Sequence, residues 1–231
     1  MVKVKICGLT RLADIDAVNA ARPDFIGFVF AESRRRVSPT QAAELRAALA
    51  PGIIPVGVFA DAPIDEIGCL VGRGIISAVQ LHGDEDEKFI AALKRELAFI
   101  TAFKRRPPGS VKIIKAVAIE KPGDAQAWNN SAADFLLLDK KGGGTGETFD
   151  WKLIGDLQKL FFLAGGLSPE NVADAVRNVK PFAVDVSSGV ETNGVKDPKK
   201  IHEFTAVFEE DTTWIKKDVS ENTAGSTFPK H

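Results

Sequence analysis

Short runs of apolar and β-branched residues recur along the chain at a nearly even spacing. This repetition restricts the possible folds more than any other feature. Eight such runs occupy residues 2–6, 25–30, 55–60, 77–81, 113–117, 135–138, 160–163 and 182–186. Each is followed by a small loop and then by a segment with helical features. Continuous apolar runs of about four to eight residues, alternating with helical segments, are typical of parallel strands buried on both faces.

Several of the intervening segments have helix-start signals. Ser38 and Ser168 each precede a proline, which is favoured in the first helical turn. We therefore expect eight alternations of strand and helix over roughly 210 residues, which fits a closed (β/α)8 TIM barrel of the shorter kind. A doubly wound open sheet is the alternative. It is less favoured, because no glycine-rich dinucleotide loop follows the first run.

The 231 residues are enough for one large domain, and we assign residues 1–208 to a single barrel domain. Thirty Lys and Arg face 31 Asp and Glu, giving a net charge of −1, so nothing indicates a nucleic-acid or anionic-membrane partner. An apolar share of 45% excludes intrinsic disorder for most of the chain. Residues 209–231 turn polar, and we expect either a short extra helix on the barrel or a disordered tail.

Cysteine usage and the N-terminal segment indicate a reducing compartment. Cys7 and Cys69 form neither a disulfide framework nor a zinc-binding spacing, and we expect no metal site. The chain start lacks the apolar stretch of a signal peptide, and nowhere do about 18 apolar residues run together. The expected location is therefore the cytoplasm. Cys69 lies among apolar neighbours in a helical segment, and we expect it to be inert core packing.

In this architecture, function lies at the carboxyl ends of the strands. The side chains and turns found there are Cys7, Arg34, Arg35, Arg36, His82, Asp139, Gly165, Gly166, Asp185, Ser187, Ser188 and Gly189. Cys7 is either a buried packing residue or a reactive thiol, and its position alone does not decide between them. Asp139 follows a buried run, and the glycine-rich loop after it favours a carboxylate that faces a pocket over a helix cap.

The remaining strand-end residues indicate anion binding. The glycine and serine loops after the seventh and eighth runs either offer backbone N–H groups to a phosphate or are only tight turns. The three arginines are either a solvated charge run or a site for a carboxylate. His82 fits the role of a base, a substrate contact or a satisfied polar residue. Together these residues predict a phosphorylated substrate with a second anionic group, and a thiol–carboxylate pair for proton transfer.

The strand-end motifs, taken together, resemble the phosphoribosylanthranilate isomerase family of tryptophan biosynthesis. The resemblance runs in order from residue 3 to about residue 206. It rests on VKICGLT (4–10), GFVF (27–30), SRRRVSP (33–39), VGVF (56–59), VQLHG (79–83), LLD (137–139), GGTGETFDW (143–151), LAGGL (163–167) and AVDVSSGVE (183–191). Two positions depart from the family pattern: Arg36 stands where an aromatic residue is frequent, and Glu147 where lysine is frequent.

The resemblance implies a reaction and a set of roles. The reaction is the Amadori rearrangement of N-(5-phosphoribosyl)anthranilate to 1-(2-carboxyphenylamino)-1-deoxyribulose 5-phosphate, the third step from chorismate to tryptophan, with no cofactor. Cys7 would be the general base, Asp139 the general acid, and Arg35 would hold the anthranilate carboxylate. His82 and Asp185 would contact substrate. The phosphate would be held by Gly165, Gly166, Ser187, Ser188 and Gly189.

Two alternatives to this function remain, and two requirements follow from it. Another phosphosugar isomerase or lyase on the same barrel is the enzymatic alternative; an inactive binding module is the other. The resemblance leaves open whether the protein is a monomer or a homodimer. For the acid–base chemistry, burial should raise the pKa of Asp139, whereas a nearby cation should lower that of Cys7.

Strand alternation adds a structural prediction. If Cys7 points into the barrel mouth, Lys5 and Lys3 point inward as well, whereas Val4 and Ile6 face the helices. A buried lysine needs a partner, so we expect Lys5 within hydrogen-bond reach of Asp139, Asp185 or Cys7.

Overall fold

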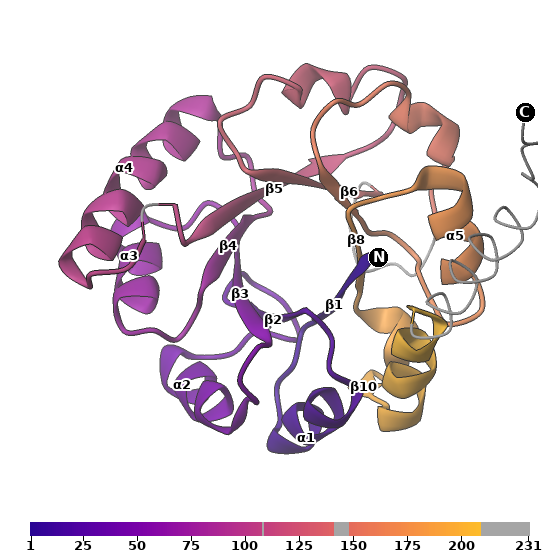
Figure 1. Ribbon diagram of the computed structural model, residues 1–231, viewed down its shortest axis with the longest axis horizontal. Helices are drawn as coiled ribbons and strands as arrows, with labels where there is room; N and C mark the ends of the chain where they lie inside the picture. Colours follow the sequence, from indigo (N-terminus) through magenta and orange to yellow (C-terminus); the bar gives the residue numbers. More distant parts are fainter. Residues whose placement is uncertain (108, 141–147, 209–231) are drawn as a thin grey trace, which may run out of the picture.

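The strands of the eight apolar runs pair in chain order and close into a barrel. The computed structural model describes residues 1–107, 109–140 and 148–208. The barrel consists of β1 (Lys3–Cys7), β2 (Phe25–Val29), β3 (Ile54–Phe59), β4 (Ala78–Leu81), β5 (Lys112–Ala118), β6 (Phe135–Asp139), β7 (Phe161–Leu163) and β8 (Ala183–Val186). All neighbours are parallel, and β8 returns to β1. The prediction of a (β/α)8 barrel is confirmed (Figure 1).

The helices form a ring outside the strands (Figure 1). The α-helices are α1 (Leu12–Ala21), α2 (Pro39–Ala48), α3 (Ile64–Gly72), α4 (Glu87–Phe103) and α5 (Val172–Val179), and residues 198–208 are also helical. Short 3-10 turns are η1 (Gln126–Trp128), η2 (Trp151–Ile154) and η3 (Ser188–Val190). Among the described residues, none of the helices is long and apolar enough to cross a membrane.

Two connections depart from the expected alternation, and in the described part of the β6–β7 connection the helical element is the 3-10 turn η2. Residues 119–134 join β5 to β6 through η1 instead of an α-helix. The segment contains Pro122, Gly123 and the pair Asn129-Asn130, all of which disfavour a helix interior. The barrel therefore lacks one covering helix at this place, next to β5 and α4.

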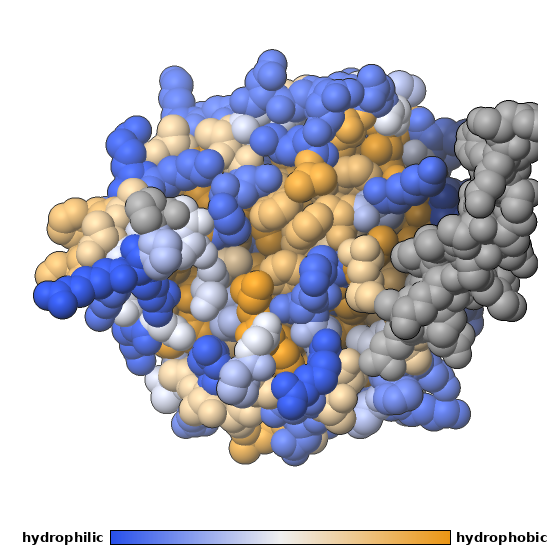
Figure 2. Space-filling model, viewed as in Figure 1, coloured by the Kyte–Doolittle hydropathy of each residue, from blue (hydrophilic) through white to orange (hydrophobic). Residues whose placement is uncertain are grey.

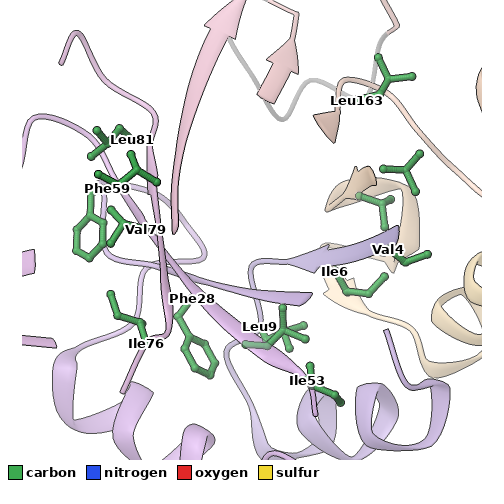
Figure 3. Close-up of a cluster of buried hydrophobic side chains, with 14 of the residues drawn as sticks. Val4, Ile6, Leu9, Phe28, Ile53, Phe59, Ile76, Val79, Leu81 and Leu163 are labelled. Carbon is green, nitrogen blue, oxygen red and sulfur yellow. The ribbon is translucent and has the colours of Figure 1, made fainter. Parts of the chain in front are cut away.

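Alternation along the strands separates two apolar layers. Val4 and Ile6 of β1 belong to the large outer layer between the strands and the helices, as predicted; Figure 3 shows them with Phe28 of β2. The inner layer includes Val56, Ile114 and Leu137, which fill the barrel axis. Because the interior is packed, polar chemistry is confined to the ends of the barrel.

Aromatic rings fill the barrel towards the amino ends of the strands. The Phe162 ring contacts those of Phe25, Phe135 and Phe182, with centroid separations of 5.4 to 5.7 Å. Figure 2 shows this face, where the chain begins, with apolar residues near its middle and hydrophilic ones around them. The strand-end residues of interest lie at the other end of the barrel.

Three further expectations concern Cys69, the glycine-rich loop after β6 and the C-terminal tail. Cys69 is exposed, so the prediction that it packs in the core is wrong. Helix α3 buries Ile67, Leu70 and Val71, and a helical turn of about 100° per residue places Cys69 on the outer side. The glycine-rich loop 141–147, with Glu147, and the expected tail 209–231 lie outside the described residues.

Candidate active site

Cys7 and Lys5 of β1 lie against Asp185 of β8. Lys5 and Asp185 are register partners, and the Lys5 ammonium lies 2.9 Å from Asp185 Oδ1. Lys5 is completely buried. Burial opposes its charge, but Asp185 and Cys7 outweigh burial and raise the pKa of Lys5. The predicted pairing of Lys5 is confirmed. Lys3, by contrast, is half-exposed and pairs with Asp24 at 2.7 Å.

The Cys7 thiol is buried at the carboxyl end of β1. Burial raises its pKa, Lys5 lowers it, and Asp185 raises it again, so that the pKa lies above that of an ordinary thiol. The expectation of a lowered Cys7 pKa is therefore wrong for the free protein. The main reason is burial of the thiol, and the charge of Asp185 adds to it by opposing the effect of Lys5. Cys7 rests as a thiol.

Asp139 ends β6 and is largely buried. Burial raises the pKa of its carboxyl group to about 6, against the opposing hydrogen bond that Lys140 N–H donates to Oδ1 at 2.7 Å. Asp185 raises this pKa further, whereas Lys5 lowers it. The expectation of a raised Asp139 pKa is confirmed. The same Lys5–Asp185 pair thus acts electrostatically on both Cys7 and Asp139.

His82 follows β4 and lies at the same mouth. Its Nε2 is 3.9 Å from Asp139 Oδ2, and its Nδ1 is 2.9 Å from the Gln80 amide. Burial and the charge of Lys5 lower the pKa of His82, so the ring is neutral at neutral pH. The Nε2 atom of a neutral ring can donate a hydrogen bond to a substrate hydroxyl or accept one from it.

The loops after β7 and β8 pack directly on each other. Gly165 and Gly166 both have positive φ values, 84° and 63°, which favour glycine. A Cβ at Gly189 would clash with the carbonyl oxygen of Leu167. Ser187 donates its hydroxyl to the Cys7 carbonyl at 3.1 Å, and Ser188 and Gly189 begin η3. The close approach of backbone in these loops is compatible with a phosphate held by N–H groups.

The three arginines after β2 separate in the structure. Arg35 donates from Nε and Nη2 to Glu191, at 2.6 and 2.9 Å. Arg34 also reaches Glu191, at 2.9 Å, whereas Arg36 pairs with Glu32 on the surface. The idea that all three share one anion is therefore not supported, because Arg36 has a different partner.

Sequence reasoning missed several buried polar residues near this mouth. Glu191 and Lys196 pair across a small hairpin, β9 (Glu191–Thr192) and β10 (Val195–Lys196). The turn Asn193-Gly194 between them is a strong hairpin signal that identifies this element in the sequence. Gln80, buried two residues before His82, has no comparable signal. Its position on β4, with the parity of His82, is the only indication.

Comparison with known proteins agrees with the geometry. Residues 4–207 match the family model of N-(5'-phosphoribosyl)anthranilate (PRA) isomerase. The isomerase of Acetivibrio thermocellus is 45% identical over 211 residues, covering 88% of this chain and 94% of the relative. That of Endomicrobium trichonymphae is 43% identical, covering 90% and 98%.

Solved structures give the same result. The isomerase of Thermus thermophilus superposes with a TM-score of 0.77 at 34% identity, covering 90% of this chain and 99% of that one. A second, with a TM-score of 0.74 at 37% identity and the same coverage, is a complex with reduced 1-(o-carboxyphenylamino)-1-deoxyribulose 5-phosphate. A third, with a TM-score of 0.75 at 36% identity and again the same coverage, consists of monomers generated from the dimeric enzyme of Thermotoga maritima. The barrel, the strand-end residues and these relatives together show that the chain belongs to the phosphoribosylanthranilate isomerase family.

Proposed function

We propose that this chain isomerises N-(5-phosphoribosyl)anthranilate with Asp139 as the general acid and Cys7 as the general base. Asp139 protonates the ribose ring oxygen, and the ring opens to a Schiff base. Cys7 then removes the proton from C2, and the resulting enolamine tautomerises to the ketone. One observation supports this assignment above all. Cys7 and Asp139, whose carboxyl pKa is raised, lie at one barrel mouth and have the same charged neighbours, Lys5 and Asp185.

The proton count of the two groups is compatible with this cycle. At neutral pH, Asp139 with its pKa of about 6 is mostly ionised, whereas Cys7 is a thiol. The productive form, protonated Asp139 with Cys7 thiolate, holds the same number of protons. A proton shift between the groups generates it without exchange with solvent. The Lys5 ammonium stabilises the thiolate in that form.

Substrate anions have separate places at the mouth. Arg35 supports a site for the anthranilate carboxylate, and the paired loops at Gly165, Gly166 and Ser187–Gly189 support one for the phosphate. We assign contacts with substrate hydroxyls to His82, which lies 3.9 Å from Asp139, and to Asp185, which pairs with Lys5. We also infer a cytoplasmic protein that is either a monomer or a homodimer; its two cysteines are both free, as in a reducing compartment.

The test is loss of anthranilate fluorescence when purified protein receives phosphoribosylanthranilate made in situ. General acid–base groups contribute about 10²–10⁴-fold, so Cys7→Ala and Asp139→Asn should each lower kcat at least about 100-fold. Arg35→Ala should act first on KM, because a remote carboxylate anchor supplies uniform binding. Cys69→Ala is the matched control, since it removes the same atoms from an exposed site, and should stay within about threefold. If Cys7→Ala also turned over like wild type, Cys7 would not be the base.

A further inference from the structure

A buried charged cluster surrounds Glu191 and takes no part in the proton transfers between Asp139, Cys7 and substrate. The Glu191 carboxylate is 5% exposed and accepts hydrogen bonds from Arg35, Lys196 and Arg34. Burial opposes its ionisation, but the hydrogen bonds from Arg35 and Lys196 outweigh burial and lower the pKa of Glu191 to about 2. Glu191 is therefore an anion at neutral pH.

The β9–β10 hairpin fixes the position of this anion. Its turn residues Asn193 and Gly194 have φ values of 53° and 77°, as in a two-residue turn with both residues left-handed. Glu191 and Lys196 are directly opposite each other, and the Lys196 ammonium lies 2.7 Å from Glu191 Oε1. Lys196 also donates to the Ser187 carbonyl at 2.8 Å, immediately after β8. The hairpin is thus tied to the strand end beside Cys7.

The guanidinium of Arg35 meets Glu191 along one edge only. A guanidinium has five N–H donors in a rigid fork, and it can bind a carboxylate along more than one edge. Glu191 takes the Nε–Nη2 edge, with distances of 2.6 and 2.9 Å. Among the described residues, no group bonds to Nη1, and the Nη1–Nη2 edge is left for a second carboxylate. The Arg35 stem passes over Gly8, where a Cβ would clash with Arg35 Cδ, so this arginine lies beside the end of β1.

We propose that Glu191 is a positioning residue that aims the Nη1–Nη2 edge of Arg35 at the carboxylate of the substrate's aromatic ring. This inference rests on the proposed function, in which Arg35 binds that carboxylate. Two effects of removing the Glu191 charge have opposite signs. Without the negative charge of Glu191, Coulomb repulsion is smaller and an anionic ligand should bind more tightly. If Glu191 also orients Arg35, its loss should instead weaken binding of the carboxylate. The direction of the change therefore distinguishes positioning from simple charge.

The experiment compares two ligands by calorimetric titration. One is reduced 1-(2-carboxyphenylamino)-1-deoxyribulose 5-phosphate; the other is its counterpart without the ring carboxyl group. Glu191→Gln should weaken the first at least about tenfold and leave the second within about twofold, since charge-assisted bidentate pairs carry this order of affinity. Added to Arg35→Ala, it should cause no further selective loss. Glu203→Gln is the control, because within the described part of the chain Glu203 pairs with Lys199 alone, at 3.6 Å on the helix 198–208.

Other outcomes overturn the proposal. An equal loss for both ligands would mean that Glu191 only supports the fold, and unchanged or tighter binding of the carboxylated ligand would mean that it does not aim Arg35. If Glu191→Gln does not fold, Glu191→Asp takes its place. This variant keeps the charge, but its side chain is one methylene too short to reach Arg35, and the same selective loss is expected. The proposed function fails separately. It would fail if the wild type did not isomerise phosphoribosylanthranilate, even though it bound both ligands and preferred the carboxylated one through Arg35 and Glu191.

Discussion

The buried carboxyl of Asp139 should make the protein less stable at neutral pH than it would be with an uncharged side chain there. Its pKa in the folded protein is about 6, against an ordinary 3.8. Below pH 3.8 both folded and unfolded chains are protonated, and the group has no effect. Between these two pH values the unfolded chain loses its proton first, so stability falls as the pH rises, and above pH 6 the full loss remains.

The size of the effect follows from that difference. At about 1.36 kcal/mol per pH unit, Asp139 destabilises the folded state by about 3 kcal/mol at pH 8. Asp139→Asn never ionises, and its side-chain oxygen can still accept the hydrogen bond from Lys140 N–H. We expect the variant to be more stable than wild type by up to about 3 kcal/mol at pH 8 and by under about 1 kcal/mol at pH 4. It should also have lost its activity.

Urea unfolding at intervals from pH 4 to pH 8 measures this difference. Asp124→Asn is the control with the opposite sign. Asp124 lies near the surface and is partly exposed, and the backbone N–H groups of Glu120 and Lys121 donate to it and lower its pKa. Its stabilisation is present above its ordinary pKa and is lost in acid, so this variant should be less stable than wild type mainly at high pH. A stability difference for Asp139→Asn that stayed the same from pH 4 to pH 8 would refute the argument.

Two further predictions concern the acid–base pair and its surroundings. The plot of kcat/KM against pH should rise up to about pH 6, the pKa of Asp139, and then stay level. It should fall only above the ordinary pKa of a thiol, because the pKa of Cys7 is raised. A profile that already falls above pH 6 would contradict a single proton shared by Asp139 and Cys7. Gly27→Ala should lower kcat about tenfold to 100-fold in steady-state assays, because a Cβ there would lie 2.6 Å from Cys7 Sγ and displace it. Gly72→Ala on α3, with no contact closer than 3.9 Å, is its control and should keep full activity.

Much of the architecture and the strand-end positions could be predicted from sequence, because they depend on local signals. Apolar runs, helix starts and turn residues each act within a few positions of the chain, and their even repetition predicts a closed barrel. Alternation then placed Val4 and Ile6 outside and Lys5 inside. The pairing of Lys5 with Asp185, 180 residues away, was predictable only because barrel closure brings β8 beside β1. Where local signals were ambiguous, as for Cys69 in an apolar helix, prediction of the buried side was wrong.

The tertiary structure alone decided the electrostatic balance at the site. Whether the pKa of Cys7 rises or falls depends on its burial and on how Lys5 divides its charge between Cys7 and Asp185, and neither can be derived from spacing. The partner of Arg35 is a similar case. Asn193-Gly194 predicts a hairpin, but which side chain its Glu191 meets depends on loops after β2 and β8 that come together only when the barrel closes. Sequence thus determined which groups stand at the strand ends, because that is local. Folding determined which charges they share, because Coulomb interactions depend on distance and burial in three dimensions.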